Sequence, residues 1–263
     1  MTDYEYTFIE TELRDGVALC TLNRPDALNS ITREGHHELE ALFTQLADDR
    51  AVKAVVLTGA GRAFCAGGDV KGMDPDAYDS PAGIFDSGAR NLLARLLSIE
   101  KPVIAAVNGD AVGLGATLAL ACDVIFMAEQ ARIGDPHVKV GLVPGDGGAV
   151  LWPLLVGPSR AKEYLMTGDL IPAAEAERIG LVNHVGPAES MLADALALAA
   201  RLAGGATLAV RFAKLSVQRT LLQSVLHSLD LSLALEALTG NSNDYEEALA
   251  AFAAKRKPEF KGR

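Results

Sequence analysis

The sequence predicts an α/β fold that ends in a helical C-terminal region, and two observations carry this prediction. Up to about residue 187, short apolar segments rich in β-branched residues alternate with helical patterns, as in a sheet whose strands alternate with helices. From residue 188 onward the pattern is almost wholly helical and rich in alanine and leucine. We therefore expect a strand-and-helix core over residues 1–187 and a helical region over residues 188–263.

Length, charge and cysteine usage narrow the class of protein. The chain has 263 residues, of which 49% are hydrophobic, so it can bury a sizeable core. Its formal net charge of −10 argues against nucleic acid as a partner, because such binding depends on cationic contacts to phosphates. Three widely spaced cysteines without a CxxC motif indicate reduced thiols in a cytoplasmic protein, with no metal site. We expect neither a secretory signal nor a membrane span, because long uninterrupted apolar runs are absent from the sequence.

The first elements of the expected core can be placed from turn and cap signals. Residues 6–22 predict two strands around residues 14–16, since Asp-Gly is a strong hairpin signal. Thr32 can cap a helix that runs to about Asp48, with leucines at helical spacing. Residues 52–58 predict a buried strand, because they are mostly β-branched or apolar and end at a glycine.

A glycine-rich loop over residues 59–69 follows that strand. It matches neither a P-loop nor the dinucleotide fingerprint. We expect a surface loop over residues 71–86, part of which, residues 73–85, would form a pocket wall together with residues near Trp152. The remaining expected elements are a helix over residues 88–98, strands over 102–107, 123–128, 131–133 and 181–185, and helices ending at Leu120 and over 149–155, 159–167 and 173–180.

Two glycine-rich turns, at residues 66–68 and 113–115, each follow an expected buried strand. The second turn opens a helix, whose N-terminus carries unpaired N–H donors and partial positive charge. If the turns face each other, two N–H groups could hold one carbonyl oxygen as it becomes an oxyanion. The alternative, that these glycines serve only turns and tight packing, stays open at this point.

Five motifs follow one another along the chain. They are Phe64-Cys65-Ala66-Gly67-Gly68-Asp69-Val70, Ala106-Val107-Asn108-Gly109 with Gly113-Leu114-Gly115, Ala121-Cys122-Asp123, Gly141-Leu142-Val143-Pro144-Gly145 with Gly147-Gly148, and Leu165-Met166-Thr167-Gly168. In order and spacing they resemble the crotonase superfamily, the enoyl-CoA hydratases and isomerases. The likeness runs from about Gly16 to the basic C-terminal residues. It is specific for the fold and the superfamily, but not for the reaction.

The resemblance implies a crotonase-like (ClpP/crotonase) spiral of repeated ββα units with a C-terminal helical region that trimerises, often into a hexamer of two trimers. It also implies a lyase or isomerase of fatty acid metabolism, with an acyl-CoA substrate and no cofactor apart from the coenzyme A of that substrate. By motif position, the oxyanion donors would be the backbone N–H groups of Gly68 and Leu114.

The resemblance further implies a set of CoA-binding positions. These positions are Arg24, Ala27, Ala63, Ala66, Phe252 and Lys255. Asp26 stands where the family often has a lysine, which weakens the expected phosphate contact. Phe252 and Lys255 match tail positions that help to bind the CoA of a neighbouring subunit, although Lys255 could equally belong to a solvated basic end.

The chain departs from the family pattern at both catalytic glutamates. The positions of the two glutamates of a typical hydratase are occupied here by Thr117 and His137. Thr117 can hydrogen-bond a water molecule but cannot exchange a proton near neutral pH. His137 can exchange a proton, because the ordinary pKa of histidine is about 6.5.

A carboxylate beside His137 would fix its tautomer and leave the other ring nitrogen as a base. Asp146, nine positions later across a glycine turn, is the expected partner. Asp135 is a rival partner, although it precedes Pro136 and could instead turn away or serve the turn. Asp146 could also cap the helix that is expected to begin near Gly147.

Three functions remain open. The first is an acyl-CoA hydratase or isomerase in which His137, backed by Asp146, is the acid/base. The second is a β-diketone C–C hydrolase, because a His–Asp pair at this place resembles the 6-oxocamphor hydrolase branch of the superfamily. The third is a non-catalytic crotonase-fold binding protein, because both glutamates are missing.

Overall fold

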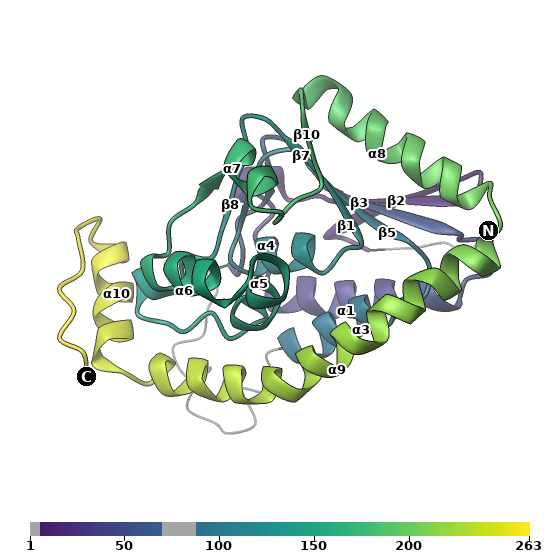
Figure 1. Cartoon of the computed structure of the whole chain (residues 1–263). Helices are drawn as coiled ribbons and strands as arrows, with labels where there is room; N and C mark the ends of the chain where they lie inside the picture. Colours follow the sequence, from purple (N-terminus) through teal and green to yellow (C-terminus); the bar gives the residue numbers. More distant parts are fainter. Residues whose placement is uncertain (1–5, 70–87) are drawn as a thin grey trace.

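The computed structural model describes residues 6–69 and 88–263 of the chain. The surface loop expected over residues 71–86 and the pocket wall expected over residues 73–85 lie outside these described residues. Within them, the chain forms two sheets and a set of helices that enclose the sheets (Figure 1).

The larger sheet has the strand order β1-β2-β3-β5-β7-β10 in the described part of the chain. Its strands are β1 (Ile9–Arg14), β2 (Val17–Leu22), β3 (Ala54–Gly59), β5 (Val103–Val107), β7 (Val124–Ala128) and β10 (His184–Gly186). β1 and β2 form the predicted antiparallel hairpin, whose turn residues Asp15 and Gly16 both have positive φ. From β2 to β10, neighbouring strands run parallel. β10 begins three residues later than expected, because Asn183 still accepts a side-chain hydrogen bond from the Ile125 N–H group.

A smaller sheet has the order β4-β6-β8-β9. Its strands are β4 (Ala63–Cys65), β6 (Asp110–Val112), β8 (Arg132–Gly134) and β9 (Ile171–Pro172). β3, β5 and β7 of the larger sheet are each followed by a strand of the smaller sheet and then by a helix. This repeat confirms the predicted ββα organisation.

The helices agree closely with the sequence predictions. They are η1 (Pro25–Ala27), α1 (Arg33–Asp48), α3 (Ala89–Ser98), α4 (Leu114–Leu120), η4 (His137–Val140), α5 (Gly148–Val156), α6 (Pro158–Thr167), α7 (Ala173–Arg178), α8 (Ala188–Ala203), α9 (Thr207–Gly240) and α10 (Asn243–Ala253). The predicted cap of α1 is present, since the Gly35 N–H group donates to the Thr32 hydroxyl over 3.1 Å.

The larger sheet is covered by helices on both faces (Figure 1). Successive side chains of a strand point to opposite faces. Val56 and Ile104 therefore pack under α8, whereas Val55 and Leu57 belong to the main core with α1 and α3. The division at residue 187 stays a proposal, and α8 packs directly on the sheet of the preceding core.

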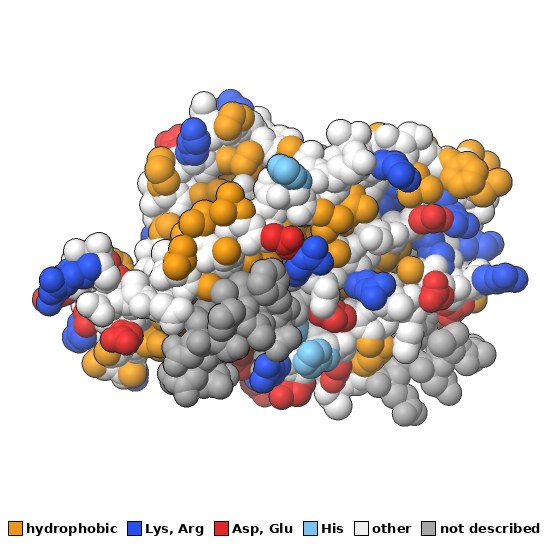
Figure 2. Space-filling model, turned by 90° about the horizontal axis from the view of Figure 1, so that it is seen from below, with side chains coloured by type: hydrophobic (Ala, Val, Ile, Leu, Met, Phe, Trp, Pro, Cys, Tyr) orange, Lys and Arg blue, Asp and Glu red, His pale blue; other side chains and the backbone are white. Residues whose placement is uncertain are grey.

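Helix α9 packs along α3 and α5. By length and composition alone it could cross a membrane, and it is the one such helix among the described residues. Its contact with the core accounts for part of its apolar character. Its exposed apolar side chains are Leu208, Phe212, Val217, Leu231, Leu235 and Leu238. Hydrophobic side chains gather on the face seen from below, the side along which α9 runs (Figure 2).

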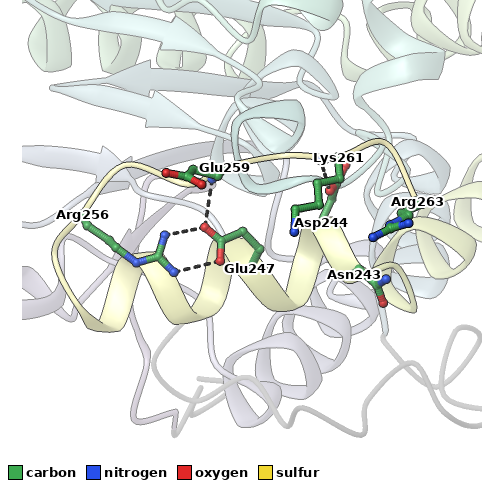
Figure 3. A pocket seen from close by; sticks show the side chains of 7 residues that line it. All are labelled: Asn243, Asp244, Glu247, Arg256, Glu259, Lys261 and Arg263. Carbon is green, nitrogen blue, oxygen red and sulfur yellow. Dashed lines mark hydrogen bonds and ion pairs between the residues drawn. The ribbon is translucent and has the colours of Figure 1, made fainter.

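The C-terminal tail folds back along α10 and lines a small surface cavity with it (Figure 3). The Asp244 carboxylate accepts hydrogen bonds from the backbone N–H groups of Lys261 and Gly262, at 2.6 and 2.7 Å. The Glu247 carboxylate accepts from the Arg256 guanidinium and from the Glu259 N–H group. Two acidic side chains of α10 thus fix the basic tail.

Candidate active site

The turn at Gly67 and Gly68 is held from one side by the segment around Ile31. The Ile31 N–H group donates to the Gly67 carbonyl over 2.8 Å, and the Asp69 N–H group donates to the Ile31 carbonyl over 2.9 Å. In a trans peptide the C=O and N–H groups point in opposite directions. Because the Gly67 carbonyl points at Ile31, the N–H group of Gly68 points away from it.

The second glycine turn packs directly against Gly67. Gly67 has φ +91°, and a Cβ atom on it would lie 2.8 Å from the Val112 carbonyl oxygen and 3.6 Å from the Leu114 nitrogen. Only glycine fits this approach without strain. Neither Gly68 nor Leu114 donates its N–H group to an acceptor among the described residues. The structure therefore brings the two predicted oxyanion donors onto adjacent turns.

His137, the first residue of η4, lies beside the second of these turns. A Cβ atom on Gly113, the residue before Leu114, would lie 3.3 Å from the Cε1 atom of the imidazole. The His137 side chain is only 16% exposed. The imidazole and the candidate oxyanion donors thus face one region of the molecule.

The imidazole lies between two carboxylates. Its Nδ1 atom forms a short hydrogen bond with Asp135, whose side chain is fully buried. Its Nε2 atom lies 3.7 Å from the Asp146 Oδ2 atom, which is ion-pair contact but longer than a hydrogen bond. The partner that orients the ring is therefore Asp135, and the expectation that Asp146 would back the histidine needs this correction. Asp135 does not turn away at Pro136, because the short turn after β8 also brings its carboxylate to within 3.4 Å of the His137 N–H group.

Thr117 joins the same cluster from α4. Its hydroxyl lies 3.5 Å from the Asp146 Oδ1 atom, and its methyl group packs against Gly147. Gly147, rather than Asp146, is the N-cap residue of α5. A hydrogen bond from the Gly148 N–H group to the Asp146 carboxylate nevertheless lowers the pKa of Asp146. All three residues predicted to be catalytic, Thr117, His137 and Asp146, therefore lie together.

Burial and charge shift the pKa values of this cluster. Burial alone would lower the pKa of His137, but the carboxylates of Asp135 and Asp146 outweigh burial and raise that pKa well above 6.5. Burial raises the pKa of Asp146 from 3.8 to about 6, against the opposing effect of the His137 charge. The two carboxylates therefore favour the protonated form of the imidazole, and burial moves the pKa of the Asp146 carboxyl towards neutral pH.

Helix α9 packs behind residues 137–148, the segment that carries His137 and Asp146 and is called the candidate catalytic stretch here. The Thr239 hydroxyl accepts a hydrogen bond from the Val143 N–H group over 3.1 Å. The buried Glu236 side chain packs against Gly145, and its charge contributes to the raised pKa of His137. Sequence reasoning missed Glu236, and the one signal for it was an acidic residue within an otherwise apolar helical run.

The cluster also has the composition of a metal site. Side-chain ligand atoms of Asp135, His137 and Asp146 all lie within 4.8 Å of one another. The imidazole, however, turns one ring nitrogen towards each carboxylate. That arrangement is typical of a hydrogen-bonded triad, whereas three ligands of one ion would point at a common centre.

The six predicted CoA-binding residues do not form one group. Arg24, Ala27, Ala63 and Ala66 lie near the Gly68 turn, whereas Phe252 and Lys255 lie at the exposed end of α10. The Ala63 carbonyl accepts from two asparagine side chains, and the Ala66 N–H group donates to the Leu28 carbonyl. Their roles towards CoA stay predictions.

Comparisons with known proteins agree with one another. The family model described as "Enoyl-CoA hydratase/isomerase" matches residues 12–263. A Rhizobium meliloti protein described as "Probable enoyl-CoA hydratase" is 39% identical over 261 residues, covering 99% of each chain. The 1,2-epoxyphenylacetyl-CoA isomerase of Escherichia coli is 37% identical over 259 residues, covering 97% of this chain and 99% of the relative. The crystal structure of an enoyl-CoA hydratase/isomerase from Mycobacterium paratuberculosis superposes with a TM-score of 0.86 at 38% identity, covering 93% of this chain and 98% of the other.

Proposed function

The chain belongs to the enoyl-CoA hydratase/isomerase family, and on that premise we propose that it is an enzyme that transfers protons on the acyl group of a CoA thioester. One observation supports this most strongly. Two backbone N–H groups without acceptors among the described residues and a charged Asp–His–Asp cluster meet around Gly113.

In the proposed mechanism the thioester carbonyl oxygen accepts hydrogen bonds from the N–H groups of Gly68 and Leu114. Negative charge develops on this oxygen when the acyl group becomes an enolate. Each preorganised donor lowers the barrier by about 3–4 kcal/mol. The donors stabilise the enolate whether the overall reaction is a hydration or a double-bond shift.

The acid/base work belongs to the His137–Asp146 couple, and Asp135 orients the imidazole. At neutral pH Asp146 is the proton acceptor and His137 the proton donor, because the pKa of the first is about 6 and that of the second lies well above 6.5. In a hydration, Asp146 takes one proton from water while the oxygen of that water bonds to C3. The enolate then takes a proton at C2 from the couple, so that one water is added in total.

In a double-bond shift, the same couple removes a proton from one carbon of the enoyl chain and returns a proton to another. No water is consumed in that case. The Thr117 hydroxyl, next to Asp146, can hold a water or orient the carboxylate, but cannot itself exchange a proton at neutral pH.

Turnover of crotonyl-CoA and of longer 2-enoyl- and 3-enoyl-CoAs tests this proposal. The variant His137→Gln should lose about 10²- to 10⁴-fold in kcat, which is the usual contribution of a general acid or base. The matched control is His184→Gln on β10, an exposed histidine that stacks on Phe126. If the purified protein neither binds CoA thioesters nor turns any of them over, the proposal is wrong.

The proposal includes an assembly and a location. The exposed apolar side chains of α9 support a homotrimer or a hexamer, in which Phe252 and Lys255 would reach the CoA of a neighbouring subunit. Three free cysteines are consistent with a cytoplasmic enzyme. Sedimentation of the purified protein with and without CoA tests the assembly.

A β-diketone C–C hydrolase is the second candidate. Two observations favour it. Thr117 and His137 stand at the positions where a typical hydratase has its two glutamates, and a carboxylate holds the Nδ1 atom of His137. Cyclic β-diketones should then gain the mass of one water on incubation with the protein. The third candidate, a non-catalytic binding protein, is disfavoured because a buried charged cluster is costly to keep without a function.

A further inference from the structure

We propose that Arg24 is a positioning residue of the oxyanion hole: its guanidinium locks the turn at Gly67–Asp69 in the peptide orientation that directs the Gly68 N–H group towards the substrate. This inference rests on the proposed function, in which Gly68 is an oxyanion donor. It differs from the role that the sequence suggested for Arg24, which was contact with CoA.

The guanidinium of Arg24 forks between two parts of the chain. Its Nη1 atom donates to the Ser30 carbonyl over 2.7 Å, and its Nη2 atom donates to the Asp69 carboxylate over 3.1 Å. Ser30 lies directly before Ile31, and Asp69 lies directly after Gly68. The arginine therefore ties the supporting segment to the residue that follows the candidate donor.

Hydrogen bonds to Asn29 also fix the backbone of Arg24, and this restricts the positions that its guanidinium can reach. The Arg24 N–H group donates to the Asn29 side chain over 2.9 Å, and the Asn29 N–H group donates back to the Arg24 carbonyl over 2.9 Å. The Asn29 amide also donates to the carbonyls of Ala60, Ala63 and Phe64. This network joins the turn after β2 to the loop that precedes Gly67.

The turn needs such a lock, because two consecutive glycines make a peptide flip cheap. If the peptide between Gly67 and Gly68 rotated by half a turn, its carbonyl would point away from Ile31 and its N–H group would face Ile31. The hydrogen bond from the Ile31 N–H group to the Gly67 carbonyl opposes that flip directly, and the bond from the Asp69 N–H group to the Ile31 carbonyl holds the next peptide in place. The Arg24–Asp69 contact also opposes the flip, because rotating this peptide would displace the neighbouring Asp69 and stretch its ion pair with Arg24.

The partly exposed position of the pair agrees with a positioning role. The side chains of Arg24 and Asp69 are 33% and 17% exposed, and ion pairs that reach solvent add little to global stability. A lysine at position 24 presents a single ammonium group and lacks the planar fork that reaches two acceptors at fixed angles. Arg24→Lys should therefore recover only part of the activity that Arg24→Gln loses.

The test uses a chromophoric ligand, a cinnamoyl-CoA with a para-dimethylamino group. Its absorption moves to longer wavelength when its thioester carbonyl accepts strong hydrogen bonds. The wild-type protein, Arg24→Gln, Arg24→Lys and the control Arg178→Gln are compared. Arg178 forms an exposed ion pair with Glu175 on α7. Arg178→Gln therefore removes the same charge as Arg24→Gln, but at a place away from the candidate site. The dissociation constant of the probe, the kcat and KM for crotonyl-CoA and the urea unfolding midpoint are measured for each.

We expect Arg24→Gln to lose most of the red shift and about 10- to 100-fold in kcat, with little change in probe affinity or unfolding midpoint. Arg24→Lys should fall between that variant and the wild type, and Arg178→Gln should match the wild type. A full red shift in Arg24→Gln would overturn the inference, as would weakened probe binding with an unchanged shift, which would make Arg24 a CoA contact. If the wild-type protein itself gives no red shift, the proposed function fails instead.

Discussion

Replacing Asp146 by asparagine should stabilise the protein while it abolishes activity. The substitution keeps the volume of the side chain and a hydrogen-bond acceptor for Thr117, but it removes a buried negative charge. Burial raises the pKa of Asp146 from 3.8 to about 6, although His137 opposes the rise. Ionising this carboxyl is therefore harder in the folded protein than in the unfolded chain.

The magnitude follows from that shift. Between pH 3.8 and about 6 the folded protein binds more protons than the unfolded chain, so the free energy of unfolding falls as the pH rises through this window. A rise from 3.8 to about 6 corresponds to a cost of about 3 kcal/mol above the window. The side-chain amide of the variant resembles the neutral carboxyl, so the variant avoids this cost.

Urea unfolding at pH 4, 6 and 8 measures the effect. The difference between Asp146→Asn and the wild type should be near zero at about pH 4 and should grow to about 3 kcal/mol in favour of the variant at about pH 8. The control is Asp230→Asn on α9, which removes the exposed carboxylate that pairs with Arg90 of α3. A variant that is less stable than the wild type at pH 8, or equally shifted at every pH, would refute the reasoning, because it would show that ionising Asp146 is not what costs stability in the folded protein.

Three further predictions come from the same structure. The kcat for crotonyl-CoA should rise with pH through about 6 as Asp146 ionises, and should fall only well above 6.5 as His137 loses its proton; a profile that is flat from pH 5 to 8 would contradict these assignments. Gly67→Ala should lower both activity and unfolding midpoint, because the φ of +91° is strained for alanine and its Cβ atom would lie 2.8 Å from the Val112 carbonyl; wild-type behaviour in both assays would show that the turn tolerates a side chain. Lys214→Met should destabilise the protein by about 3–5 kcal/mol in urea unfolding, because it removes the charged partner of the Asp123 carboxylate, which lies 2.7 Å from the ammonium group. A cost below about 1 kcal/mol would mean that the pair behaves as an exposed ion pair.

Local signals predicted much of the fold. The hairpin at Asp15 and Gly16, the cap at Thr32 and the buried strands each follow from a few neighbouring residues, and the structure confirms them. The smaller sheet was only partly predicted. β4 and β6 have three residues each and β9 has two, which is too short for any periodicity to emerge from the sequence.

The sequence predicted most of the residues that form the candidate site, but not the contacts between them. Motif positions pointed to Gly68, Leu114, Thr117 and His137, and the spacing across the glycine turn pointed to Asp146. The structure brings these residues together. The choice of Asp146 as the partner that orients His137 was wrong, because the direction of Asp135 depends on the turn geometry after β8, and that turn brings Asp135 to Nδ1. Glu236 lies 99 positions from His137, and its charge acts on the imidazole only because α9 packs behind the candidate catalytic stretch, which no local pattern encodes.

Deuterium exchange at C2 of butyryl-CoA tests the central claim most directly, because it reports proton transfer next to the thioester without assuming hydration or isomerisation. The protein is incubated with butyryl-CoA in D₂O, and the mass of the acyl group is followed over time. We predict that the wild-type protein incorporates deuterium at C2 and that His137→Gln and Asp146→Asn do so at least about 100-fold more slowly. Binding of butyryl-CoA without any exchange, or equal exchange by all three proteins, would contradict the claim that the His137–Asp146 couple moves protons on an acyl-CoA.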